Sequence, residues 1–281
     1  MKIWMFIFAL LLSSCSGGGV DKNSPVDQPT ILRTDIKFGY FASLPGQAEE
    51  VRDHTNIFMD GGFTSPALSA QSVIAAGQPA LLSVQPYLWD TVGKVSRPRP
   101  DARERLRAYL ATLQSLGALQ HVIGLYPHDE PELYQISEAQ FVAMITLCRE
   151  VAREFGIEAI IAVIYTSHGP WIGISATDWA GFDDYSNGSA IFFNGSYARL
   201  KGALRPTQRI ILVPGMANPW RADLTPFINM AHTDPQVVWI AVFVWFDGAE
   251  FTGAGVKSNG LAKTACDAGR ALIGALGACA F

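Results

Sequence analysis

Eight short apolar runs constrain the fold of this chain more than any other sequence feature. The runs are continuous rather than alternating, which is typical of strands that are buried on both faces in a parallel sheet. They cover residues 36–42, 56–60, 80–87, 121–126, 159–165, 179–185, 209–215 and 237–246. Eight strands that alternate with helices over about 245 residues match the count and length of a (β/α)8 barrel. The sequence therefore predicts an α/β fold consisting of a single TIM barrel.

Amphipathic segments between the runs supply the expected helices. The clearest cover residues 101–117 and 137–156, and a third, 261–277, follows the last run. Ser137 is the expected N-cap of the second helix, and the first two end on a glycine, as helices often do. A doubly wound sheet is the alternative fold. It would ordinarily carry a glycine-rich phosphate turn after an early strand, and FASLPGQ at 41–47 is not such a turn.

The first residues indicate export. Lys2 precedes an apolar run of about ten residues, which is too short to span a bilayer. The following LSSC, ending at Cys15, resembles the lipobox of bacterial lipoproteins, which implies cleavage before Cys15 and a fatty acyl group such as palmitate on the mature end. An ordinary signal peptide with an incidental cysteine is the alternative. Ser16, in place of an aspartate, implies the outer membrane of the cell envelope. We expect a signal peptide over 1–14, a lipidated flexible tether over 15–31 and the barrel over 32–281.

Charge and cysteine content narrow the possible partners. The formal net charge of −4 argues against nucleic acid as a partner. Cys148 lies in a helical pattern and is expected in the core, whereas Cys266 and Cys279 could pair in an oxidising compartment, a question that the sequence leaves open. The cysteine spacing matches no metal motif. We expect no metal, no cofactor, contact with a membrane through the lipid alone, and a monomer.

Polar and aromatic residues gather just past the expected strands. In a TIM barrel the C-terminal ends of the strands converge on the active site. Aromatic rings can stack on the apolar faces of sugars while carboxylates bind their hydroxyls, although any one aspartate here is at least as often a loop cap. The combination therefore predicts a carbohydrate site. The substrate-binding candidates are Asp60, Tyr87, Trp89, Asp129, Tyr165, Tyr185 and Trp245.

Three local patterns resemble those of glycoside-hydrolase-like barrels. GLYPHDEP at 124–131 is similar to a fourth strand that ends in an acidic pair followed by proline. DWAGFDDYSNG at 178–188 is similar to the sixth-strand pattern Asp-x-x-Gly-x-Asp-x-Tyr, which marks Asp183 and Tyr185. FVWFDG at 243–248 resembles the last strand of many such enzymes, where Trp245 would form the floor of the sugar site. The resemblance implies a glycoside hydrolase acting on a poly- or oligosaccharide.

Cleavage of a glycosidic bond requires a carboxylic acid and a second carboxylate across the sugar. We predict Glu130 as the acid, kept protonated by the charge of Asp129, and Asp183 or Asp247 as the partner, with Asp60 as a third candidate. A helix N-terminal acid is the alternative role of Glu130.

Two departures from the pattern keep a second function open. The seventh run, ILVPGMANP at 211–219, contains no acid, whereas the commonest retaining barrels carry a nucleophilic glutamate there. Asp129 also stands where those enzymes have asparagine. The alternative is a non-catalytic, surface-tethered glycan-binding barrel. A metal-dependent hydrolase is disfavoured because the first run lacks a His-x-His pair.

Overall fold

The structure, a computed structural model, describes residues 33, 35–62, 65–185, 190–217, 219–248, 253–277 and 279, without the side chains of 184 and 190–194. The expected signal peptide, the tether and the lipidation site Cys15 lie outside these residues and stay predictions. Within the described part, no helix has the length and apolar character needed to cross a membrane.

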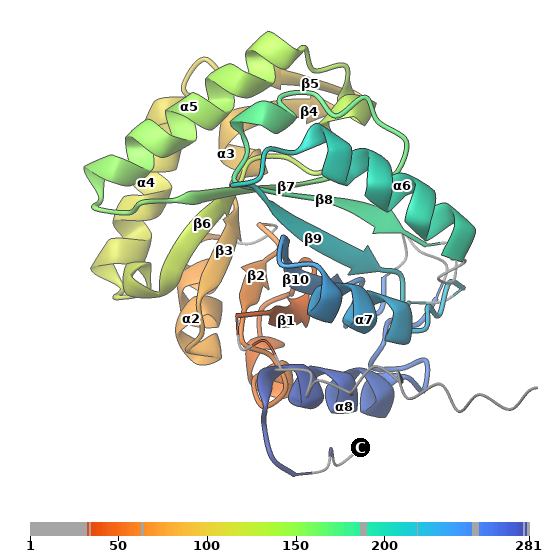
Figure 1. Cartoon of the computed structure of the whole chain (residues 1–281). Helices are drawn as coiled ribbons and strands as arrows, with labels where there is room; N and C mark the ends of the chain where they lie inside the picture. The colour runs from red at the N-terminus through yellow and green to blue at the C-terminus, as the bar shows by residue number, and fades with distance from the viewer. Residues whose placement is uncertain are drawn as a thin grey trace, which may run out of the picture. The chain divides into compact units, whose positions relative to one another are not determined.

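Eight parallel strands form a nearly closed barrel (Figure 1). They are β1 (Lys37–Tyr40), β2 (Phe58–Asp60), β3 (Ala80–Ser83), β6 (Val122–Tyr126), β7 (Ile160–Tyr165), β8 (Trp179–Asp184), β9 (Arg209–Pro214) and β10 (Val237–Val242). Hydrogen-bonded ladders join them in the order β1-β10-β9-β8-β7-β6-β3-β2. The single TIM barrel predicted from the eight apolar runs is confirmed.

Helices surround the strands (Figure 1). They are α1 (Ala48–Val51), α2 (Pro66–Ala76), α4 (Ala102–Ser115), α5 (Glu138–Glu154), α6 (Ala190–Ala203), α7 (Thr225–Thr233) and α8 (Ala262–Ile273). Ser137 caps α5 as expected, with a reciprocal hydrogen bond to Gln140 that forms a capping box. The connection between β7 and β8 differs from the regular alternation, because residues 166–178 hold only a short 3-10 helix, Ile174–Ala176.

An insertion follows β3. The expected strand over 80–87 ends at Ser83, and Gln85–Leu88 forms the short helix α3 instead, with Pro86 in its first turn. A β-hairpin then forms from β4 (Trp89–Val92) and β5 (Val95–Pro98). The third connection of the barrel therefore carries an extra wall before α4.

Two layers of apolar side chains fill the molecule. The inner layer lies inside the barrel and includes Met59, Leu81, Ile164 and Trp239. The larger outer layer lies between strands and helices and includes Leu125 and Cys148, which is a buried free cysteine as expected. Along a strand, neighbouring residues alternate between the two layers.

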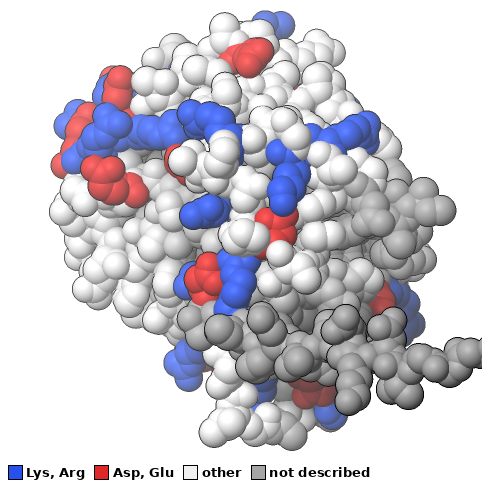
Figure 2. Space-filling model, viewed as in Figure 1, with Lys and Arg blue, Asp and Glu red and all other residues white. Residues whose placement is uncertain are grey.

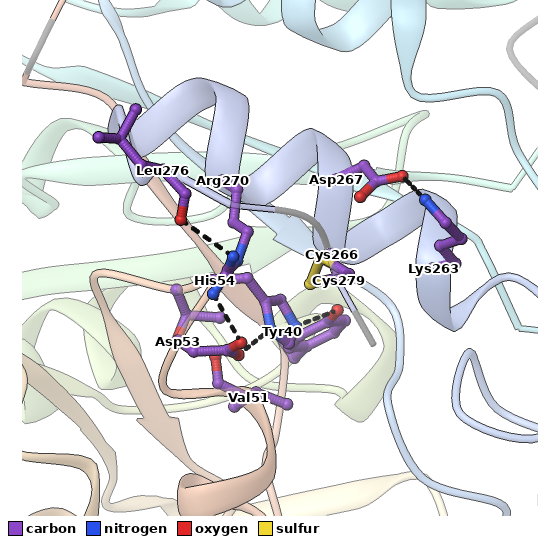
Figure 3. Close-up of a disulfide and its surroundings, with 11 residues drawn as sticks. Tyr40, Val51, Asp53, His54, Lys263, Cys266, Asp267, Arg270, Leu276 and Cys279 are labelled. Carbon is purple, nitrogen blue, oxygen red and sulfur yellow. Dashed lines mark hydrogen bonds and ion pairs between the residues drawn. A yellow bond between two sulfur atoms is a disulfide. The ribbon is translucent and has the colours of Figure 1, made fainter. Parts of the chain in front are cut away.

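The C-terminal helix closes against the start of the barrel. A disulfide joins Cys266 of α8 to Cys279, with the Cα atoms 6.1 Å apart (Figure 3). Beside it, buried His54 lies between the Tyr40 hydroxyl at 3.0 Å from Nε2 and Asp53 at 2.7 Å from Nδ1. The guanidinium of Arg270 donates to Asp53 at 3.0 Å. Tyr40, Asp53, His54 and Arg270 are called the α8 network below.

Surface charges on the helices are largely paired. Arg103 and Arg107 of α4 form ion pairs with Glu150 and Glu154 of α5. Figure 2 shows basic and acidic side chains side by side over this region, at the upper left. Exposed pairs of this kind contribute little stability, about 0–1 kcal/mol each.

Candidate active site

The segment after β6 places two acids at the mouth of the barrel. The Tyr126 side chain belongs to the inner layer, and its hydroxyl donates to Asp129 Oδ1 at 2.6 Å. Glu130 has a left-handed backbone, with φ 42° and ψ 57°, and its N–H donates to Ile164 O of β7 at 3.0 Å. The strand has already ended at Tyr126, so strict alternation no longer separates Asp129 from Glu130.

The end of β8 supplies the third acid. The Tyr185 hydroxyl donates to Asp183 Oδ2 at 2.8 Å. The Tyr185 ring packs on Trp220 and Phe243, with centroid distances of 4.5 and 5.1 Å. All three rings are half-buried, so part of this aromatic wall faces solvent beside Asp183. Asp129, Glu130 and Asp183 are called the rim cluster below.

The three acids are within electrostatic reach of one another. Burial, followed by the charges of Asp129 and Glu132, raises the pKa of Glu130 to about 7. Burial and then the charges of Asp129 and Glu130 raise the pKa of Asp183 well above its usual value. Burial likewise raises the pKa of Asp129 to about 6. Among the described residues, no Lys or Arg forms an ion pair with the rim cluster, and the exposed Lys94 only partly offsets the shift at Glu130.

His128 is a neutral structural residue. Its side chain is fully buried, and burial lowers its pKa to about 4. In the tautomer that fits its neighbours, Nδ1 donates to Asp129 O at 2.6 Å and Nε2 accepts from Ser96 Oγ at 3.1 Å. His128 therefore fixes the backbone of the Asp129 turn to the β4–β5 hairpin.

A cavity of about 300 Å³ lies at this end of the barrel. Its lining includes Phe41, Gln85, Trp89, Tyr126 and Asp129. A larger cavity of about 720 Å³ lies at the opposite end, beside Val122 and Ile160 at the starts of their strands, and Glu158 is the one acid in its lining. We place the candidate site at the first cavity because its lining combines Asp129 with Ser83 and Tyr126, which end β3 and β6. Glu130 and Asp183 are not part of that lining.

Several candidates from the sequence point away from the mouth. Asp60 accepts from Ser69 of α2 at 2.7 Å, and Tyr87 stacks on Tyr109 of α4 with a centroid distance of 4.3 Å. The Tyr165 hydroxyl donates to Ile172 O at 3.0 Å. These side chains belong to the layer between strands and helices, because they occupy the outward positions of their segments or pack on helices.

The two candidates that follow β10, Trp245 and Asp247, also lie away from the mouth. Trp245 is 1% exposed, packs on Tyr40 and donates to Glu50 Oε2 at 2.8 Å, so it lies in the outer layer rather than on the floor of the mouth. Asp247 accepts from Gly255 N and Ser258 Oγ, both at 2.8 Å, and thereby fixes its own loop. Of the three expected catalytic acids, the structure brings Glu130 and Asp183 together and leaves Asp247 in separate contacts. The roles of all the candidates stay predictions.

The sequence interpretation missed the two other rings of the aromatic wall and Glu132. Phe243 continues the alternation of Trp239 and Ala241, both in the inner layer, so a period of two could have identified it. Trp220 lies in the loop after β9, and no strand pattern predicts its position. Glu132 follows Pro131 and accepts from Thr166 at the end of the neighbouring strand β7.

The comparisons with known proteins concern the fold. No family model and no curated protein matches this chain. A GH113 β-1,4-mannanase structure matches with a TM-score of 0.54 at 10% identity, over 86% of this chain and 99% of that one. ScGas2 matches with a TM-score of 0.52 at 11% identity, over 77% and 55%.

A third neighbour is the FMN-binding β-glucuronidase of Facaelibacterium prausnitzii L2-6, with a TM-score of 0.52 at 14% identity over 75% of this chain. The chain spans only 37% of that glucuronidase and 28% of the one from Parabacteroides merdae. The mannanase and the glucuronidase are glycoside hydrolases by name, and the likeness to them shows that this chain shares their fold.

Proposed function

We propose that the chain is a glycoside hydrolase that cleaves a poly- or oligosaccharide at the cell envelope with two carboxyl groups. One observation carries the proposal: the rim cluster gathers three acids from β6 and β8 at the mouth of the barrel without a paired cation among the described residues. Such a cluster keeps a carboxyl group protonated near neutral pH, as Glu130 illustrates with a pKa of about 7.

The two tyrosines distinguish the roles of the acids. Asp129 and Asp183 each accept a tyrosine hydroxyl, which favours their ionised forms. No described side chain hydrogen-bonds the Glu130 carboxyl in this way, and we therefore assign the shared proton to Glu130 in the proposed mechanism. Burial and the charge of Asp129 still raise the pKa of Asp183, whereas the hydrogen bond from Tyr185 and the loss of repulsion from a neutral Glu130 favour its charged form.

The reaction follows from this distribution of charge. Glu130 donates its proton to the departing glycosidic oxygen. As the glycosidic C–O bond breaks, the Asp183 carboxylate either bonds to the anomeric carbon, giving an intermediate that water then hydrolyses with Glu130 as base, or takes a proton from a water molecule that attacks that carbon. The wall of Tyr185, Trp220 and Phe243 offers flat apolar surface for stacking a sugar ring beside Asp183.

A glycan-binding barrel without catalysis is the second candidate. It is favoured by one observation: β9 ends at Pro214 and is followed by Gly215, Met216 and Ala217, so no acid faces the cluster from that strand. The aromatic wall would serve binding equally well.

The cellular location is part of the proposal. The LSSC stretch at 12–15 supports export, lipidation of Cys15 and retention at the envelope. Incorporation of labelled palmitate into the chain, and its loss in Cys15→Ser, tests this part of the proposal.

An assay of reducing-end release tests the catalytic proposal. Residues 21–281 are incubated with a panel of polysaccharides, with β-1,4-mannan and glucuronide-containing glycans first because structural neighbours act on such bonds by name. Turnover by the natural sequence and its loss in Glu130→Gln supports the proposal. Equal turnover in both contradicts the assignment of Glu130. Glycan binding without turnover in either protein favours the binding barrel.

A further inference from the structure

We propose that Glu132 is a positioning residue of the rim cluster: it ties the turn that carries Glu130 to the end of β7 and keeps a further negative charge beside that acid. The catalytic meaning of this inference rests on the proposed function, whereas the coupling between the two glutamates does not.

Glu132 makes a two-point contact with the neighbouring strand end. Its Oε1 accepts from the Thr166 backbone N at 2.6 Å and from Thr166 Oγ1 at 2.8 Å. Thr166 is the first residue after β7, and its own carbonyl accepts from Trp171 Nε1 at 2.9 Å. Thr166 is therefore held by Trp171 and by Glu132, and Glu132 connects it to the turn after β6.

The turn has a shape that it would not favour alone. Glu130 and Gln135, neither of them glycine, have φ values of 42° and 54° on either side of the short 3-10 helix Pro131–Tyr134. Side chains with a Cβ rarely adopt this left-handed conformation, so contacts outside the turn must stabilise it. The described contacts to β7 are the hydrogen bond from Glu130 N to Ile164 O and the pair made by Glu132.

Only one of the two Glu132 carboxyl oxygens takes part in the contact with Thr166. Oε2 is buried and has no hydrogen-bond partner among the described residues. A buried carboxylate oxygen without a partner is costly, and a glutamine could accept from Thr166 through its amide oxygen without a charge.

The charge of Glu132 reaches every member of the rim cluster. It raises the pKa of Glu130, of Asp129 and of Asp183, in each case after the contribution of burial. Glu132 is thus placed to hold Glu130 in position and to keep its proton bound.

A direct titration tests the coupling without any substrate. The full chain is labelled with ¹³C at the glutamate carboxyl carbons, and the Glu130 signal is assigned by its loss in Glu130→Gln. In Glu132→Gln we expect Glu130 to titrate about half to one pH unit lower, because a negative neighbour has been removed. Glu158→Gln makes the same change of charge at the exposed opposite end and should leave the titration unchanged. An unchanged titration in Glu132→Gln overturns the proposal.

Kinetics then separate position from charge. Glu132→Gln keeps an acceptor for Thr166, so kcat at pH 5 should remain within about threefold, while the basic limb of the pH profile moves to lower pH. Glu132→Ala loses the clamp as well, and we expect kcat to fall at least about tenfold with little change in KM.

Thermal unfolding of each variant checks that it is folded. A purely structural role would lower kcat in Glu132→Ala without moving the basic limb in either variant, and that result contradicts the inference. If the natural sequence shows no turnover, the proposed function fails while the titration still decides the role of Glu132.

Discussion

The rim cluster and the α8 network are both built from ionisable side chains packed around the barrel strands, but they distribute charge in opposite ways. In the α8 network, burial would raise the pKa of Asp53, yet its hydrogen bond to His54 and the charges of His54 and Arg270 hold that pKa below its usual value. In the rim cluster, burial and like charges act together, and the pKa values of all three acids rise.

The contrast separates a structural use of charge from a chemical one. Asp53 is exposed and meets a cation, so its charge is stabilised and its proton is absent at neutral pH. Glu130 meets other carboxylates, so its proton remains available for transfer. The same residue types therefore serve two purposes, and the identity of the neighbours decides between them.

The largest expected effect comes from removing the proposed acid of the rim cluster. Glu130→Gln should lower turnover of a glycan by about 10²–10⁴-fold, the usual contribution of a general acid. An aryl glycoside with a dinitrophenol leaving group needs no proton, so the same variant should lose less than about tenfold on that substrate. Steady-state kinetics on both substrates measure the difference, and an equal loss on the two would exclude the role of Glu130 as acid.

A matched pair of aspartates gives the next effect. Asp183→Asn removes the second carboxylate of the rim cluster and should lower kcat about 10²-fold or more. Asp247→Asn removes a carboxylate that contacts only its own loop in the described structure, and kcat should change less than about threefold. A larger loss in Asp247→Asn than in Asp183→Asn would exchange the two assignments.

A substitution at His54 tests the structural role of the α8 network. His54→Ala leaves the Tyr40 hydroxyl and Asp53 without their shared partner, and should lower the free energy of unfolding by about 2 kcal/mol. Urea denaturation measures this loss, and kcat of the folded variant should remain unchanged. His121→Ala, at a more exposed position, is the control and should stay within about 0.5 kcal/mol.

The smallest expected effect is a gain in the free energy of unfolding when an acid of the rim cluster is removed. The folded chain keeps a proton on Glu130 up to about pH 7, whereas the unfolded chain releases it near the ordinary value of 4.5. The folded state thus binds more protons between these values, and this group loses its stabilising contribution as the pH rises through that window.

Glu130→Gln has no carboxyl group to titrate at this position, so it avoids this loss of stability at high pH. We expect it to be more stable than the natural sequence by about 1 kcal/mol at pH 8, a value reduced for partial solvent screening, and equally stable at pH 4. Chemical denaturation at both pH values measures the difference, with Glu158→Gln as control. A variant that is less stable at pH 8 would show that Glu130 is not held in a repulsive cluster.

The sequence was sufficient to predict the barrel but only part of the rim. The eight apolar runs identified the strands because parallel strands are buried on both faces. For the same reason the runs carry little information about which residues point inward. Tyr165 was expected at the mouth, but it lies one position after Ile164 of the inner layer and so points outward.

Strand ends were the second source of difference. The run 237–246 was read as one strand, whereas β10 ends at Val242 and the following loop turns Trp245 into the outer layer. The contacts of Glu132 with Thr166 depend on a turn with two left-handed residues, and no local pattern predicts that shape. The run 179–185 matches β8, so the sequence located Asp183 near the end of the strand and Tyr185 directly after it, while their roles stay predictions.

The barrel is joined differently between its first and second strands than elsewhere. No ladder pairs β1 with β2, and the described backbone hydrogen bonds across this boundary run from Asn56 N to Phe38 O, from Ser43 N to Met59 O and from Gly61 N to Ser43 O. Arg270 of α8 spans the same region through Asp53, which lies between the two strands. The barrel therefore has a seam, and amide hydrogen exchange should begin there, with the chain opening along this line before any other pair of strands separates.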